Sequence, residues 1–211
     1  MAGEAAGATT ERGRRTAARL RRAARDAFAD VGYVNARVDD IVAAADVSHG
    51  TFYTYYENKA AVLADLVRSA ADRLQAVASE PWDPADEPTG LEDVTVRETI
   101  ERVIGRFLSV YAQESDVVRA WVEAAAVDGE FGRLLTKLRS GFVDRIAENL
   151  APAAFAGGHD PRTAASALVA MVEGYVIEHP DEPQAAPAEV VRTLAAIWHG
   201  GLLGLTRANG A

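Results

Sequence analysis

The sequence predicts an all-α protein of about nine helices, in which a small N-terminal domain precedes a larger helical domain. Apolar residues recur at spacings of three and four, alanine is frequent, and runs of β-branched residues are short. No segment alternates apolar and polar residues as a half-buried strand does. With 211 residues, 49% of them hydrophobic, the chain can bury a substantial core.

The first helix is expected to begin at Glu11 or Arg12 and to end at Gly32. Leu20 and Phe28 fall on one helical face, and glycine takes the left-handed conformation that often follows a helix.

Two short helices are expected next, over Val38–Ala45 and about Ser48–Tyr55. Asp46 would make a tight turn between them, because aspartate tolerates left-handed backbone better than most residues. Ser48 has the hydroxyl of an N-cap residue. Two short helices joined by a tight turn form a helix-turn-helix.

The later helices are predicted from apolar spacing and from caps such as Asp160 followed by Pro161. They are expected at about Asn58–Ser79, Val94–Ala112, Asp116–Val127, Glu130–Leu150, Pro161–Glu178 and Pro187–Arg207, with a Pro-rich acidic loop at 80–93. The predicted domains are 11–58, a helix-turn-helix DNA-binding domain, and 59–211, a ligand-binding and dimerisation domain.

Charge is distributed unevenly along the chain. The formal net charge of −9 by itself disfavours a nucleic-acid partner. Residues 1–59 nevertheless carry +1, because seven arginines lie between Arg12 and Arg25 with no acid among them. A basic N-terminal helix on an acidic body favours proximity to DNA over a merely solvated face.

The third helix has two chemically different faces. Phe52 and Tyr56 are four residues apart and can face the core. The outward residues then carry hydroxyl or imidazole tips, and Gly50 permits close backbone approach. Such a surface can enter a major groove about 12 Å wide.

The segment around this helix resembles the TetR family of bacterial regulators over roughly residues 15–66. The residues that carry the resemblance are Ile41, Ala45, Val47, Ser48, Gly50, Thr51, Phe52, Tyr53, Tyr55, Tyr56, Lys59 and Leu63. The sequence departs from the family at Asp46, where glycine is usual, and at Arg37, where a capping threonine is usual.

The resemblance implies roles for individual residues. Thr51, Tyr53 and Lys59 would contact DNA phosphates, and Arg15 would add a further phosphate contact. Ser48, His49 and Tyr55 would lie at or near base edges. Arg37 could add a phosphate contact in place of the usual cap.

The larger domain mixes aromatic and acidic residues along its helices. Candidates for a ligand pocket are Phe107, Tyr111, Trp121, Glu123, Phe142, Met171, Glu173 and Tyr175. Glu123 and Glu173 could orient a polar or cationic ligand group. The alternative, that the aromatics are simply core, is favoured residue by residue, and the existence of a pocket rests on the family resemblance.

The last two predicted helices are rich in small residues, which let helices approach closely. The resemblance implies that this pair joins its twin in a four-helix interface. A two-fold homodimer would place its recognition helices about 34–36 Å apart, or a multiple of that distance, and would bind a palindromic operator.

The composition disfavours other classes. Without cysteine there are no disulfides or thiolate zinc sites, and the histidines form no i, i+4 pair, so neither metal nor cofactor is expected. No serine lies in a G-x-S-x-G motif, so no enzyme is expected. The longest low-charge stretch, Leu194–Leu205, is shorter than the roughly 20 apolar residues of a membrane-spanning helix, and no apolar leader is visible.

We therefore expect a cytoplasmic, ligand-responsive transcriptional regulator, a repressor released from its operator by a small-molecule effector. One alternative is a helical enzyme or carrier whose N-terminal motif does not serve DNA. The other is a protein that binds a membrane surface through its basic first helix.

Overall fold

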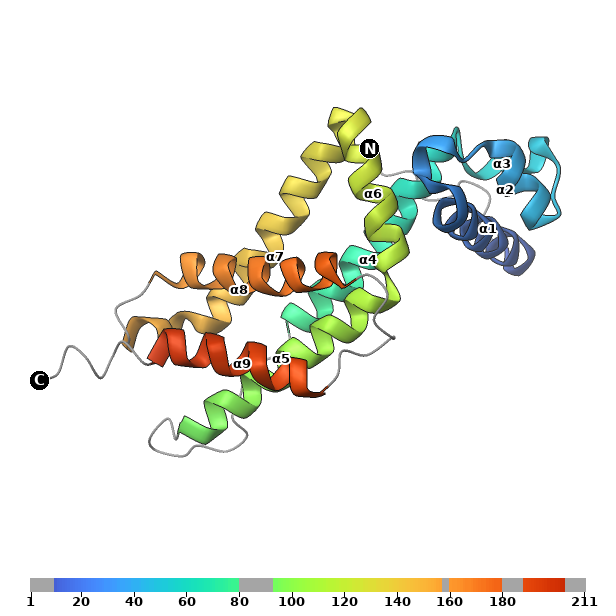
Figure 1. Ribbon diagram of the computed structural model, residues 1–211. Helices are drawn as coiled ribbons and strands as arrows, with labels where there is room; N and C mark the ends of the chain where they lie inside the picture. Colours follow the sequence, from blue (N-terminus) through green and yellow to red (C-terminus); the bar gives the residue numbers. More distant parts are fainter. Residues whose placement is uncertain (1–9, 80–92, 157–159, 180–187, 204–211) are drawn as a thin grey trace, which may run out of the picture. The chain divides into compact units, whose positions relative to one another are not determined.

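The computed structural model describes residues 10–79, 93–156, 160–179 and 188–203, and within these ranges it contains nine α-helices and no strand (Figure 1). The helices are α1 (Glu11–Asn35), α2 (Val38–Ala45), α3 (His49–Tyr55), α4 (Lys59–Ala78), α5 (Asp93–Gln113), α6 (Ser115–Val127), α7 (Gly129–Ala156), α8 (Pro161–Glu178) and α9 (Ala188–Leu203). The predicted all-α class is confirmed. The predicted loop at 80–93 lies almost wholly outside the described residues, as does the end of the last predicted helix.

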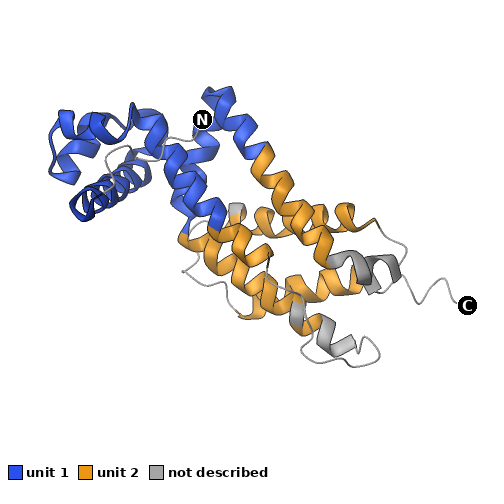
Figure 2. Cartoon of the chain, turned by 180° about the vertical axis from the view of Figure 1, so that it is seen from behind, with its two compact units in different colours: residues 1–72, 114–136 blue, residues 73–113, 137–211 orange. Residues whose placement is uncertain are grey.

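The chain divides into two compact units (Figure 2). Unit 1 comprises the described residues up to Asp72 together with Glu114–Thr136, and unit 2 comprises the described residues of Arg73–Gln113 and those from Lys137 onward. The predicted division at 58/59 followed the end of the helix-turn-helix motif. The compact N-terminal unit also takes in the first part of α4, α6 and the beginning of α7, because α6 packs against α1.

Helix α1 begins and ends through local backbone chemistry. The Thr10 hydroxyl accepts a hydrogen bond from the Gly13 amide at 3.1 Å. Gly32 has φ 77° and ψ 161°, which breaks the helical geometry, and the chain then continues in helical form to Asn35. The helix is therefore kinked at the glycine that the sequence marked as its end.

The turn between α2 and α3 forms as the sequence predicts. Asp46 takes the left-handed conformation at φ 48°. The Ser48 hydroxyl caps α3 by accepting the Thr51 amide at 3.1 Å. At the start of α2 the Arg37 amide donates to the Asp40 carboxylate at 2.8 Å, so Asp40 supplies a capping contact where the family's usual threonine is absent.

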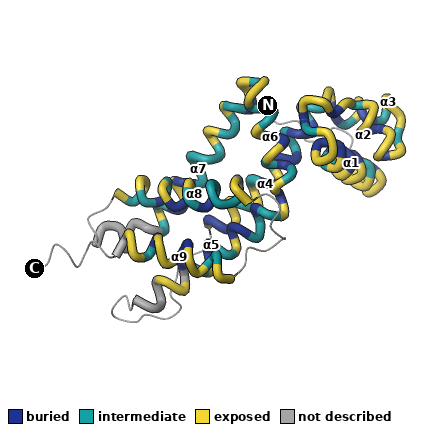
Figure 3. Tube along the Cα trace, in the orientation of Figure 1, coloured by how far each residue is buried: buried dark blue, intermediate teal, exposed yellow. Residues whose placement is uncertain are grey.

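Each unit has its own apolar core, with buried and exposed positions alternating around the helices (Figure 3). In unit 1 the largest fully buried side chains include Leu20, Ile41, Phe52 and Leu63. In unit 2, α5 contributes Ile100, Ile104 and Leu108 and packs against both α8 and α9. The Asp160 carboxylate caps α8 through the Thr163 amide at 2.7 Å, as predicted.

Candidate nucleic-acid interface and ligand cavity

Helix α3 presents the outward face that the sequence predicts. Phe52 is fully buried and Tyr56 is buried, whereas Tyr53 is 57% exposed. Ser48, His49 and Gly50 are exposed, and Thr51 and Tyr55 are half-buried. The structure therefore brings all six predicted contact residues of the Ser48–Tyr55 segment together on one short helix and its cap.

The inward face of α3 is fixed by a polar contact as well as by packing. The Tyr56 hydroxyl donates to Asp65 of α4 at 2.7 Å, and Arg21 of α1 lies 3.3 Å from the same carboxylate oxygen. Burial and the hydrogen bond to Asp65 raise the pKa of Tyr56, so the phenol stays protonated. One carboxylate thus joins α1, the end of α3 and α4.

The outward face already has internal contacts. The hydroxyls of Ser48 and Thr51 lie 2.9 Å apart, and the Ser48 oxygen is also the helix cap. His49 Nε2 lies 3.2 Å from the carboxylate of Asp39 on α2. Asp39 was not anticipated from the sequence, and it orients the imidazole of a residue predicted to lie near base edges.

The arginines of α1 divide into two groups. Arg19 donates to the backbone carbonyls of Ala45 and Asp46 in the α2–α3 turn. Arg21 reaches Asp65, and Arg25 reaches α6. Three residues of the basic run therefore hold helices together. Arg15 is exposed and bonded to Glu11 within its own helix, and Arg37 is also exposed.

The contact between Arg25 and α6 is the most buried ion cluster among the described residues. Glu114 is only 1% exposed, and its carboxylate lies 3.2 Å from the Arg25 guanidinium. Asp116 accepts from the same guanidinium at 2.6 Å. Burial works against the charged form of Arg25, but the hydrogen bond and charge of Asp116 outweigh it and raise the Arg25 pKa.

Lys59 differs from the other predicted DNA contacts. Its ammonium group donates to the carbonyls of Tyr33, Val34 and Ala36 at 2.7, 3.0 and 2.8 Å. These carbonyls lie at the end of α1. The side chain of Lys59 is thus directed at the protein backbone in this structure.

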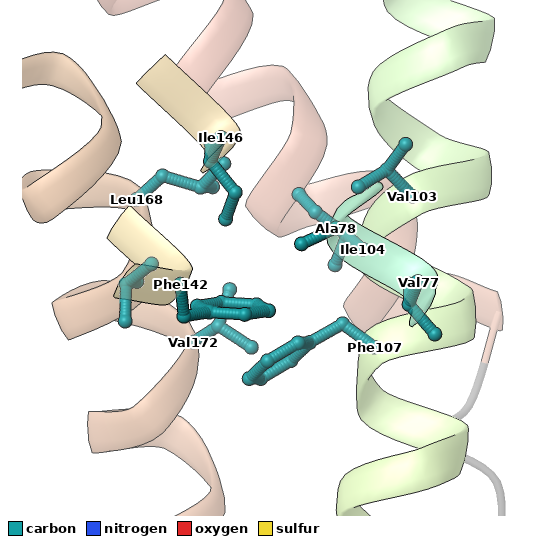
Figure 4. A pocket seen from close by; sticks show the side chains of 10 residues that line it. Val77, Ala78, Val103, Ile104, Phe107, Phe142, Ile146, Leu168 and Val172 are labelled. Atoms are coloured by element: carbon teal, nitrogen blue, oxygen red, sulfur yellow. The ribbon is translucent and has the colours of Figure 1, made fainter. Parts of the chain in front are cut away.

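Unit 2 contains an apolar cavity enclosed by four helices (Figure 4). It is partly open to solvent, and only about 20 Å³ of it is free for the centre of a water-sized molecule. Its lining residues are all apolar: Val77, Ala78, Val103, Ile104, Phe107, Phe142, Ile146, Leu168, Val169 and Val172. Sequence reasoning missed eight of them, because an aliphatic residue that lines a cavity has the same pattern as one that fills a core.

The eight predicted pocket residues are only partly brought together. Phe107 and Phe142 line the cavity, with ring centroids 5.1 Å apart. The Tyr111 ring lies tilted beside Phe107, with ring centroids 5.8 Å apart, and burial together with the charge of Glu173 raises the pKa of Tyr111 to about 12. Glu173 itself is paired with Arg139 at 3.0 Å.

The remaining predicted pocket residues lie outside the cavity lining. Met171 is half-buried on α8, and Tyr175 stacks on His179 with ring centroids 4.3 Å apart. Trp121 and Glu123 belong to unit 1, where the Trp121 indole donates to the Phe131 carbonyl at 3.2 Å and Glu123 accepts the Tyr33 amide.

None of the helices in the described residues combines the length and the apolar character that a membrane-spanning segment needs. No group of three or more histidine, aspartate or glutamate residues within the described ranges is arranged to hold a metal ion.

A chain whose described elements are all helices, and which carries a capped helix-turn-helix with an exposed polar recognition helix (α3), belongs to the class of DNA-binding transcriptional regulators. Residues 20–66 match the protein family described as "Bacterial regulatory proteins, tetR family". Residues 96–203 match the family described as "BetI-type transcriptional repressor, C-terminal". The chain belongs to the TetR family of transcriptional regulators. Members of this family bind DNA operators and small-molecule effectors and act as dimers.

Individual relatives agree with this assignment. The chain is 29% identical to the HTH-type transcriptional regulator EthR of Mycolicibacterium smegmatis over an alignment of 179 residues. This alignment covers 79% of this chain and 76% of EthR. Salmonella enterica GusR matches with a TM-score of 0.66 and 23% identity over 95% of this chain and 99% of GusR. The fatty acid degradation regulator FadR from Bacillus halodurans matches with a TM-score of 0.68 and 20% identity over 89% and 96%. These two structures share the fold.

Proposed function

We propose that this regulator is a homodimeric repressor that binds a palindromic operator and is released from it by an apolar small molecule. The outward face of α3 carries the proposal, since its exposed polar groups lie on a helix whose opposite face is locked into the core. A repressor blocks transcription by occupying its operator, and an effector that favours another conformation removes it.

The proposed DNA surface combines groups of two kinds. Thr51, Tyr53, Arg15 and Arg37 contact phosphates, and Ser48, His49 and Tyr55 lie at or near base edges. Gly50 supports close approach to DNA, because a methyl group added there would find only the Ser48 hydroxyl within 4 Å. A larger side chain would project from the exposed face and hold the helix away from the groove.

The chemistry of the cavity supports an apolar effector. Its ten lining side chains offer no hydrogen-bond partner, so a charged group placed among them would lose its hydration without compensation. Glu173 is engaged by Arg139 and does not line the cavity. An uncharged ligand with rings or an alkyl chain fits this environment best.

The proposed dimer forms through α8 and α9. Ile197 of α9 is 60% exposed in the single chain. Gly174 of α8 and Gly200 and Gly201 of α9 would meet nothing within 4 Å if given a side chain. A large apolar residue beside such open small-residue positions supports close packing of a second copy.

The experiment starts from a selection of bound sequences from random DNA by the full chain. We expect a palindromic consensus, and a labelled duplex of that sequence should form a specific complex in an electrophoretic shift. Tyr53→Ala should weaken the complex by about tenfold or more through loss of a phosphate contact. The control is Val127→Ala, because Val127 is exposed to a similar extent on α6 and should leave binding unchanged.

The effector is tested on the same complex with three ten-carbon probes: decanol, decanoate and decylamine. Decanol should release the DNA at lower concentration than either charged probe. No specific complex at low salt would contradict the repressor proposal. Release by a charged probe and not by decanol would contradict only the proposed effector chemistry.

The enzyme or carrier alternative makes a different prediction. Coupling between two ligands is reciprocal, so an effector that weakens DNA binding is itself bound more weakly when the operator is present. A carrier would bind decanol equally well with and without the duplex. Calorimetric titration of decanol into both forms separates the two functions.

A further inference from the structure

Lys59 lies where its ammonium group meets the end of another helix. The last carbonyls of a helix have no partner within the helix, and those of Tyr33, Val34 and Ala36 all accept from Lys59 Nζ at 3.0 Å or less. The ammonium also lies 4.6 Å from the centroid of the Tyr33 ring. Both contacts favour a positive charge at this position.

The three hydrogen bonds use the full donor capacity of the side chain. A lysine ammonium group has three protons and no acceptor, so the three carbonyls leave it no further proton for a phosphate oxygen. Partial burial removes part of the hydration of the ammonium group and lowers the pKa of Lys59, so the carbonyls and the ring compensate the lost hydration only in part. Contact with DNA would require at least one of these bonds to break.

We infer that Lys59 is a positioning residue and not a phosphate contact. It joins the end of α1 to the start of α4, and in this way it fixes the recognition helix α3, which directly precedes α4. The recognition helix ends at Tyr55, four residues before Lys59, so an anchor at Lys59 limits how far α3 can tilt. The same end of α1 is held from α6, because Glu123 accepts the Tyr33 amide at 2.7 Å.

The sequence offers a direct test, because Lys59 and Lys137 are its only two lysines. Lys137 is exposed on α7 and serves as the internal control. The full chain is acetylated with an N-hydroxysuccinimide ester, free and bound to the selected duplex, and each site is followed by peptide mass spectrometry. We expect Lys59 to react at least tenfold more slowly than Lys137, at the same rate with and without DNA.

Two outcomes of labelling would overturn the inference. One is equal reactivity of the two lysines in the free protein. The other is a further slowing of Lys59, several-fold beyond any change at Lys137, when the duplex is added. The free-protein measurement does not need an operator, so it stands even where the proposed palindromic binding fails.

Substitutions provide a second measurement. Arginine replaces lysine well at a phosphate but cannot direct three protons at converging carbonyls. We therefore expect Lys59→Arg and Lys59→Met to lower the midpoint of thermal unfolding by similar amounts, and to reduce the preference for the selected duplex over random DNA. A phosphate contact contributes about 0.9 to the slope of log affinity against log salt. The inference would be overturned if Lys59→Arg kept the wild-type unfolding midpoint and preference for the selected duplex, while Lys59→Met lost about 0.9 from the salt slope.

Discussion

Single residues of one type take different roles in this protein. Arg19, Arg21 and Arg25 lie within seven residues of α1, and each bonds to a different part of unit 1. Arg22 lies among them and is exposed. The position of each arginine on the helix, and not its charge, decides whether it holds another helix or remains available at the surface.

Arg25→Ala should destabilise the protein by about 3 kcal/mol, because it removes the guanidinium group that lies 3.2 Å from the buried carboxylate of Glu114. Arg22→Ala on the same helix is the matched control and should change stability by less than about 0.5 kcal/mol. Urea unfolding at equal protein concentration measures both. Equal effects of the two substitutions would show that the cluster does not stabilise the fold.

Two glycines should respond in opposite directions to alanine. At Gly32 the backbone has φ +77°, and an added methyl carbon would lie 2.7 Å from Glu123 Oε2, so Gly32→Ala should cost roughly 2–3 kcal/mol. At Gly141, inside α7, an added methyl carbon meets nothing within 4 Å. Gly141→Ala should therefore stabilise the protein by roughly 0.5–1 kcal/mol. Calorimetric unfolding that gave one sign for both would contradict this account.

At the scale of elements, the recognition helix depends on its neighbours. Helix α3 has seven residues, too few for an isolated helix to persist in water. It is maintained by the Ser48 cap, by the buried ring of Phe52 and by the bond from Tyr56 to α4. The exposed polar face can therefore be specialised for DNA without loss of the helix.

Tyr56→Phe tests the bond between the end of α3 and α4. Loss of the hydroxyl should cost about 1 kcal/mol at pH 8. Because the pKa of Tyr56 is raised in the folded state, its contribution is fully present below about pH 10, the ordinary tyrosine value, and is lost as the pH rises further. The difference between wild type and Tyr56→Phe should therefore shrink from pH 8 to pH 11.

Tyr53→Phe is the control on the same helix, because the Tyr53 side chain is largely exposed. Its stability should follow that of the wild type at both pH values, as measured by urea unfolding. A difference between wild type and Tyr56→Phe that stayed constant across this range would mean that ionisation of Tyr56 is not linked to folding.

At the scale of the whole molecule, the proposed function requires two copies of the chain. The proposed two-fold symmetry would present two recognition helices to two half-sites, and the electrostatic part of the affinity should make binding fall steeply with salt.

Ile197→Asp should dissociate the proposed dimer, because it replaces an exposed apolar side chain of α9 by a carboxylate within the proposed α8–α9 interface. Light scattering coupled to size exclusion should then report the mass of one chain, and operator binding should fall with it. Val127→Asp is the control, since Val127 is 67% exposed and lies on α6. A dimer that survived Ile197→Asp would mean that the two copies meet elsewhere.

The sequence by itself determined the helices and their caps. Helical spacing, the Ser48 and Asp160 caps and the left-handed Asp46 are local properties, set by interactions within a few residues, and the structure confirms them. The outward face of α3 follows from the same periodicity. Phe52 and Tyr56 lie four residues apart on one face of the helix, and because both are buried the opposite face is directed to solvent.

Tertiary structure alone decided which distant groups meet. The pairing of Arg25 with Glu114, the three carbonyls around Lys59 and the apolar lining of the cavity each join segments far apart in the sequence. The sequence around a basic or aliphatic residue does not show which distant residue it will contact, because long-range contacts depend on how whole helices pack. For that reason the sequence could identify Lys59 and Glu123 as polar groups of interest, and only the fold revealed what they hold.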